Sequence, residues 1–163
     1  MSADPVKIVE VGPRDGLQNE KSIIPTEAKI AFVDALSGSG LTEIEVSSFV
    51  SPKWVPQLAD ALEVFRGITR VPGVVYSALV PNEVGLDRAI EAKVDKIAVF
   101  TAASETFSQK NVGASIAETI DRFRPVLQRS TVPVRGYVST AFYCPYEGKI
   151  EPNAVVPVIE KLL

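Results

Sequence analysis

Short apolar runs rich in β-branched residues recur along the chain, and each has the length of a β-strand. Gly, Pro, Asn or Ser bounds each run, as is typical of strand ends. In the second run Glu43 and Glu45 alternate with Ile44 and Val46, so one face of that strand is polar and the other is apolar. The runs predict five strands, at residues 6–11, 43–47, 74–80, 96–101 and 134–139.

Between these runs, apolar residues recur at spacings of three and four, which predicts amphipathic helices. Thr26 is expected to cap the first helix, Asn82 the third, and Ser115 with Glu118 forms a capping box before the fourth. Pro157 is expected to bend or shorten the last helix. The predicted helices run from residue 26 to about 38, over 58–65, and onward from residues 82, 115 and 152.

This strict alternation of strand and helix predicts an α/β protein with parallel strands. An open doubly wound sheet usually carries a GxGxxG turn after its first strand, but residues 12–16 read GPRDG. Polar residues instead follow the end of each predicted strand, as in a TIM (β/α)8 barrel, whose active face lies there. We therefore expect one domain over residues 1–163, comprising about the first five βα units of such a barrel.

Composition narrows the classes of function. The 163 residues carry 17 basic and 20 acidic side chains, a net charge of −3, which is too balanced for a nucleic-acid or membrane-surface partner. The chain has no histidine, which excludes a Ser-His-Asp triad and an HExxH metal site. One cysteine excludes an internal disulfide and a multi-cysteine zinc site. Residues 1–5 contain an acid and no basic or apolar leader, so we expect a cytoplasmic location.

The strongest indication of a functional site is the pair Arg14 and Asp15, directly after the first predicted strand. A carboxylate at that point is a natural ligand for a hard cation such as Mg²⁺. A guanidinium beside it can hold an oxyanion or a carboxylate with two hydrogen bonds. The alternative is that the two side chains merely cap the loop or pair with each other.

A second set of polar residues is expected to face the inside of the barrel, near Arg14 and Asp15. Glu45 would face the inside of the barrel, where a carboxylate is costly unless it is paired, and Arg14 is the obvious partner. The alternative is a solvated Glu45 at a strand end. Arg135 and Tyr137 share a face of the fifth strand, with Arg135 deeper and Tyr137 nearer the mouth.

Two further residues have ambiguous signals. Trp54 lies between two prolines in the loop after the second strand, where it could form a rigid wall for a ligand or pack in the core. Cys144 lies in a turn-rich segment, and we interpret it as a bystander because no histidine exists to activate it as a nucleophile.

Five motifs, which span almost the whole chain, resemble the hydroxymethylglutaryl-CoA lyase family in the family's own order. They lie at residues 6–20, 48–57, 102–111, 134–139 and 144–149. The family consists of (βα)8 barrels among the metal-dependent lyases that include isopropylmalate and homocitrate synthases. The resemblance therefore implies the same barrel that the alternation of strands and helices favours.

The resemblance also implies a reaction, the cleavage of 3-hydroxy-3-methylglutaryl-CoA to acetoacetate and acetyl-CoA, aided by Mg²⁺ or Mn²⁺. It assigns metal ligation to Asp15, and it assigns polarisation of the thioester carbonyl and stabilisation of the enolate to Arg14. It places Glu45 and Tyr137 in the active site. It assigns substrate-binding positions, besides Arg14, to Gln18, Ser48, Asn111 and Ser115.

The family's other metal ligands, a His-x-His pair and an Asn, and its loop with a catalytic cysteine have no counterpart in residues 1–163. We therefore expect an N-terminal part of a lyase, inactive by itself, and a homo-oligomer, a dimer. One alternative is a catalytically dead half-barrel that binds ligand or self-associates. Another is an acetyl-CoA-condensing synthase, which the Pro-Lys-Trp-Val-Pro loop at residues 52–56 disfavours.

Overall fold

A computed structural model describes residues 6–162 of the chain, so residues 1–5, on which the expected absence of a leader rests, lie outside it. Its main sheet has four parallel strands in the order β1-β2-β3-β4, which confirms the parallel α/β prediction. Within the described residues no helix is long and apolar enough to span a membrane. The strands are β1 Glu43–Ser48, β2 Val75–Leu79, β3 Lys96–Ala102 and β4 Val134–Ser139.

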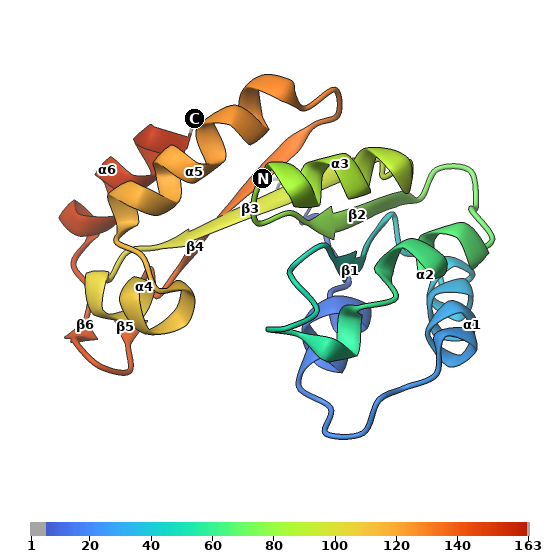
Figure 1. The fold of residues 1–163 in the computed structure, drawn as a ribbon. Helices are drawn as coiled ribbons and strands as arrows, with labels where there is room; N and C mark the ends of the chain where they lie inside the picture. The colour runs from blue at the N-terminus through green and yellow to red at the C-terminus, as the bar shows by residue number, and fades with distance from the viewer. Residues whose placement is uncertain (1–5, 163) are drawn as a thin grey trace, which may run out of the picture.

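Helices follow one another along one side of this sheet (Figure 1). Ile44 and Val46 of β1 and Ile97 and Val99 of β3 turn toward them and are almost fully buried in a shared core. The other face of the sheet carries charged residues, because side chains alternate along a strand. The helices that cover the apolar face include α1 Thr26–Ser37, α2 Ala61–Gly67, α3 Glu83–Glu91 and α5 Ile116–Arg129.

The predicted first strand, residues 6–11, does not form a full strand, so this element of the prediction was wrong. It joins the sheet through an isolated parallel bridge between Glu10 and Ile44. Glu10 N donates to Glu43 O at 3.0 Å, and Glu45 N donates to Glu10 O at 2.8 Å. Two bonds at one residue do not make a ladder, and Val6 and Ile8 are 88% and 66% exposed.

The segment after this bridge was expected to be a simple turn, but residues Gly12–Gly16 form a π-helical turn, η1. Asp15 N donates to Val11 O at 2.7 Å, and Pro13 anchors the turn as its buried residue. The turn packs against β1 and α1. Single π turns occur frequently at functional sites.

Two of the predicted helix caps are confirmed and one is wrong. Asn82 accepts from Gly85 N at 3.0 Å, and Ser115 with Glu118 forms the capping box at the start of α5. Thr26 begins α1 without capping it, because its hydroxyl donates instead to Asp60 at 2.7 Å. The helix predicted at 58–65 begins later, because Pro56–Leu58 form a separate 3-10 turn, η2, before α2.

After β3 the structure differs from the prediction at two places, and the last helix follows it. Ser104 caps a helix, α4 Glu105–Val112, which the pattern did not reveal. The turn-rich segment around Cys144 is a hairpin of β5 Tyr143–Cys144 and β6 Gly148–Lys149. The last helix, α6, begins at Pro152 as predicted, and it contains Pro157 within its 11 residues, Pro152–Leu162, without being shortened there. These elements form a second small core around Ala103 and Cys144.

Candidate active site

The π turn η1 holds the Arg14 guanidinium over the polar face of β1. Its Nε donates to Glu45 Oε1 at 2.5 Å, and its Nη1 lies 2.5 Å from Asp15 Oδ1. The predicted pairing of Arg14 with Glu45 is therefore confirmed, and Arg14 also pairs with its neighbour. The Arg14 side chain is 13% exposed, so these bonds fix it in a largely desolvated position.

Glu45 is 1% exposed, which rules out the solvated alternative. Its second oxygen, Oε2, accepts a hydrogen bond of 2.7 Å from the Tyr137 hydroxyl on β4. Burial raises the pKa of Tyr137, and the hydrogen bond to Glu45 with its negative charge raises it further. Tyr137 therefore stays protonated and donates. With both oxygens engaged, the burial of the Glu45 carboxylate is offset by charge-assisted bonds.

A second buried carboxylate, Glu43, lies two residues earlier on the same face of β1. Its Oε2 lies 2.5 Å from Lys7 Nζ and 2.8 Å from Lys96 Nζ. Its Oε1 lies 3.2 Å from Arg135 Nη1. Burial raises the pKa of Glu43, but the hydrogen bonds from both lysines and the charge of Arg135 outweigh it, so the pKa lies below its ordinary value.

Asp15 is the residue placed to ligate a metal, and its side chain is 57% exposed. Among residues 6–162 no group of three or more His, Cys, Asp or Glu side chains lies close enough to hold a metal ion. The described residues therefore fit one carboxylate ligand of a divalent-metal site and do not make a complete site.

Gln18 lies beside an open groove of about 290 Å³ next to η1. Trp54, from the loop after β1, also lines this groove and is 83% exposed, so it does not pack in the core. Gln57 also lines the groove, and its side-chain amide donates to Ser22 O at 2.8 Å and accepts from Ile24 N at 2.9 Å.

The other expected substrate-binding residues lie elsewhere. Ser48 is fully buried, and its Oγ accepts from Val50 N at 3.2 Å, which shapes the loop after β1. Ser115 caps α5 through Glu118, and Asn111 is exposed in the last turn of α4. Within the described residues, no hydrogen bond links these three side chains to Arg14. Arg14, Asp15, Glu45 and Tyr137 are the predicted site residues that share one bonded network.

Cys144 is buried rather than exposed in a loop. Its Sγ lies 3.0 Å from Ser104 Oγ and accepts from Tyr146 N at 3.4 Å. Burial raises the pKa of this thiol, but the hydrogen bonds from Ser104 and from the Tyr146 and Glu147 backbone outweigh it and lower the pKa. The interpretation of Cys144 as a bystander remains untested, since burial separates the thiol from Arg14 without excluding reactivity.

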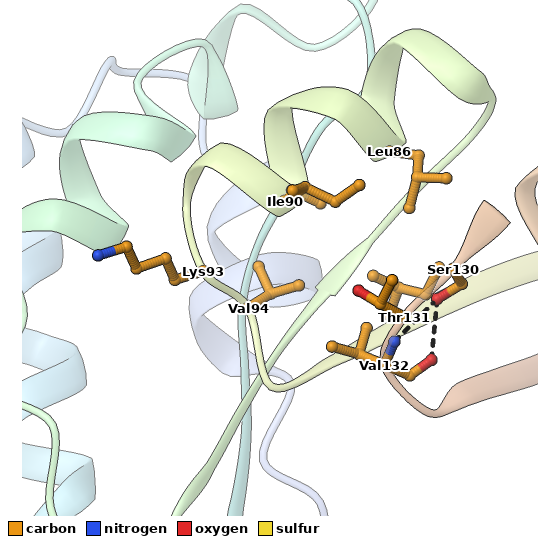
Figure 2. A pocket seen from close by; sticks show the side chains of 9 residues that line it. Leu86, Ile90, Lys93, Val94, Ser130, Thr131 and Val132 are labelled. Carbon is orange, nitrogen blue, oxygen red and sulfur yellow. Dashed lines mark hydrogen bonds between the residues drawn. The ribbon is translucent and has the colours of Figure 1, made fainter.

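A smaller cavity of about 140 Å³ lies away from this network, where α3 approaches the segment before β4 (Figure 2). Leu86, Ile90 and Val94 form its apolar wall, and Ser130 hydrogen-bonds within its own turn at 2.8 Å. The cavity opens near the amino ends of the strands and contains none of the predicted site residues.

The parallel strands, the helices on one side of them and the network of Arg14 with buried Glu45 are those of a partial (β/α) barrel, a fold whose active sites lie at the carboxyl ends of its strands. Residues 5–163 match the HMGL-like family, and the chain belongs to that family. The chain is 57% identical over 160 residues to the cytoplasmic 3-hydroxy-3-methylglutaryl-CoA lyase of Rattus norvegicus, covering 96% of this chain and 47% of that protein. It is 54% identical to the mitochondrial hydroxymethylglutaryl-CoA lyase of the same species, covering 96% of this chain and 49% of that protein.

Solved structures agree with this assignment. An HMG-CoA lyase from Brucella melitensis superposes with a TM-score of 0.95 at 52% identity, covering 98% of this chain and 58% of that chain. An HMG-CoA lyase from Acinetobacter baumannii, in complex with coenzyme A and 3-methylmalate, superposes with a TM-score of 0.93 at 39% identity, covering 99% and 54%. The chain thus has the fold of a partial TIM barrel and spans about half the length of the curated relatives it matches.

Proposed function

We propose that this chain carries the arginine-bearing part of an active site that cleaves 3-hydroxy-3-methylglutaryl-CoA to acetoacetate and acetyl-CoA. The observation that carries the proposal is the Arg14 guanidinium, held by Glu45 at 2.5 Å and only 13% exposed. Family membership supports the choice of substrate. The proposal covers a single barrel domain to which residues 1–163 belong.

In this reaction the tertiary hydroxyl of the substrate loses its proton and becomes the ketone of acetoacetate as the adjacent carbon–carbon bond breaks. The electron pair of that bond forms the enolate of the acetyl-CoA thioester, with its negative charge on the carbonyl oxygen, and a proton taken up at carbon then gives acetyl-CoA. Arg14 points N–H donors at that oxygen, so it stabilises charge that develops in the transition state. Glu45 orients the guanidinium, and Tyr137 orients Glu45 in turn. Because these bonds exist before substrate binds, little reorganisation accompanies the reaction.

Asp15 is proposed as one ligand of a divalent metal, Mg²⁺ or Mn²⁺. When bound, such an ion lowers the pKa of an oxygen that it coordinates and neutralises charge on the substrate. The carboxylate of Asp15 is exposed and offers oxygen ligands, which a hard cation prefers.

The acyl-CoA chain is proposed to run along the groove at Gln18 and over the region of Asn111 and Ser115, with Ser48 supporting the loop between them. Gln18 and Trp54 line an open surface large enough for part of a pantetheine arm. The barrel from Acinetobacter baumannii that this chain resembles binds coenzyme A, which supports a CoA ligand.

The test measures two quantities with the purified protein: binding of 3-hydroxy-3-methylglutaryl-CoA by calorimetry, and release of acetoacetate with added Mg²⁺ or Mn²⁺. We expect binding that Arg14→Lys weakens. The matched control is Arg124→Lys, because Arg124 forms an exposed ion pair with Asp121 on α5, outside the site. For residues 1–163 alone we expect no acetoacetate, because one carboxylate does not hold a catalytic metal.

Two results would contradict the proposal. Absence of binding, or binding that both arginine variants weaken equally, would remove Arg14 from the site. Binding with no turnover in any longer protein that contains this chain would support the alternative of a ligand-binding half-barrel.

A cytoplasmic location and a homodimer complete the proposal. The relative at 57% identity is named as cytoplasmic, whereas the relative at 54% is mitochondrial. Fractionation of cells that express the protein decides between the two locations.

A further inference from the structure

Two pairs of polar side chains cross the polar face of the sheet, one above the other. Tyr137 meets Glu45 in the upper pair, and Arg135 meets Glu43 in the lower pair. Each pair joins β4 to β1 over 92 positions of sequence, although β2 and β3 lie between these strands in the sheet. The upper pair reaches Arg14, and the lower pair has no part in the proposed chemistry.

We propose that Glu43 and Arg135 are positioning residues, which hold Tyr137 against Glu45 and so fix the guanidinium of Arg14. The inference rests on the proposed function for its catalytic meaning, but the geometry that it describes is independent of the reaction. Neither residue touches the Arg14 guanidinium, so any influence passes through Tyr137 and Glu45.

The contacts of Glu43 show why Arg135 is available to the upper pair. Glu43 Oε2 pairs with Lys7 and Lys96 and also accepts a hydrogen bond of 3.4 Å from Arg135 Nη2. Oε1 is buried without a hydrogen bond of good geometry and faces Arg135 Nη1 at 3.2 Å. Arg135 is therefore held against Glu43 by one long hydrogen bond and by charge. It lies two residues before Tyr137 on the same face of β4, and its positive charge lowers the pKa of Tyr137 against the effects of burial and Glu45.

The negative charge of Glu43 keeps Arg135 in the lower pair. If Glu43 loses its charge, Arg135 is attracted to the nearest remaining carboxylate, Glu45, where it competes with Tyr137 and Arg14. The unpaired guanidinium would also stabilise the phenolate of Tyr137. Loss of the negative charge of Glu43 should therefore change the pKa of the Tyr137 phenol.

The test titrates the Tyr137 phenol by ultraviolet absorbance in the whole chain, with Tyr137→Phe to assign its signal among the four tyrosines. In Glu43→Gln we expect the pKa of Tyr137 to fall by about 1–3 units, the size of effect that an unpaired charge produces at ~4–6 Å. Adding Arg135→Met to that variant should return the pKa to its original value or above it. The matched control is Glu91→Gln, which breaks an exposed pair with Arg66 and should leave the phenol unchanged.

The double variant keeps the test decisive if Glu43→Gln alone fails to fold, because it removes both members of the pair and leaves no uncompensated charge between them. In that case Arg135→Met by itself should raise the pKa of Tyr137. An unchanged phenol in folded variants of both residues would overturn the proposal. A shifted phenol together with no lyase activity in any longer protein would instead overturn the proposed function and leave the positioning network standing.

Discussion

Tyr137 donates a hydrogen bond of 2.7 Å to Glu45, although the two residues lie on β4 and β1, the outer strands of the four-stranded sheet. Side chains from outer strands meet only when the sheet curves, which is the curvature of a barrel wall. The same Glu45 binds Arg14 through its other oxygen. Curvature thus assembles the arginine site from three segments that are distant in the sequence.

Arg14→Lys should abolish most of the activity and leave the fold intact. The guanidinium reaches Glu45 with Nε and Asp15 with Nη1, and a single ammonium cannot reproduce this fork. In a lyase-competent protein that contains this chain, we expect kcat to fall about 10²–10³-fold, the usual loss when one donor to a developing oxyanion is removed. Steady-state kinetics measure the fall in kcat, and circular dichroism checks that the fold is intact. An unchanged kcat would reduce Arg14 to a structural cap.

Glu43 should make stability depend on acidic pH. Because its folded pKa lies below the ordinary value of 4.5, its contribution is present above pH 4.5 and is lost as the pH falls through the folded pKa. Each unit of lowering corresponds to about 1.4 kcal/mol. Urea unfolding of the protein and of Glu43→Gln should show a difference in unfolding free energy that shrinks from pH 6 toward pH 3. A difference that is constant over this range would contradict the role of Glu43.

Cys144 should resist thiol reagents in the folded protein despite its lowered pKa. The thiol is fully buried, so modification requires local or global opening. Ser104→Ala removes both the hydrogen bond to the thiol and the cap of α4, a loss of about 1 kcal/mol, and should speed modification. Ser130→Ala, in the turn before β4, is the matched control. Equal rates in folded and denatured protein would show that the thiol is accessible.

The protein should associate through the edges of its sheet, where apolar side chains are exposed and backbone groups are unpaired. Ile8 lies in the segment beside β1, is 66% exposed, and belongs to no ladder beyond the bridge at Glu10. Unpaired apolar edges favour pairing with a second chain. Light scattering at micromolar concentration should show a dimer or larger species.

A charge on that edge tests where the contact lies. Ile8→Lys should weaken association, whereas Val84→Lys, at a 70% exposed position on α3, should leave it unchanged. If neither variant matters, the contact lies at the β4 edge, and a monomer in all three proteins would contradict the prediction of self-association.

Local sequence patterns were sufficient to predict most of the helices and strands and one contact of the site, that between Arg14 and Glu45. The alternation in β1 predicted that Glu45 faces inward, and the next charged residue in that space, Arg14, proved to be its partner. Asn82 and Ser115 act as caps as predicted, since capping depends on residues three positions apart. Helix α4 was missed because its eight residues carry a weak apolar pattern, although Ser104 before it was a usable signal.

The sequence by itself determined the four strands β1 to β4, the helices between them other than α4, and the polar face of β1, because these properties follow from periods of two and 3.6 residues. The tertiary structure alone decided that Glu43 meets Arg135 and that Glu45 meets Tyr137, since both contacts depend on the curvature of a sheet across 92 residues. It also decided that residues 6–11 form a single bridge, because a ladder requires a neighbour along its whole length and no local pattern records one.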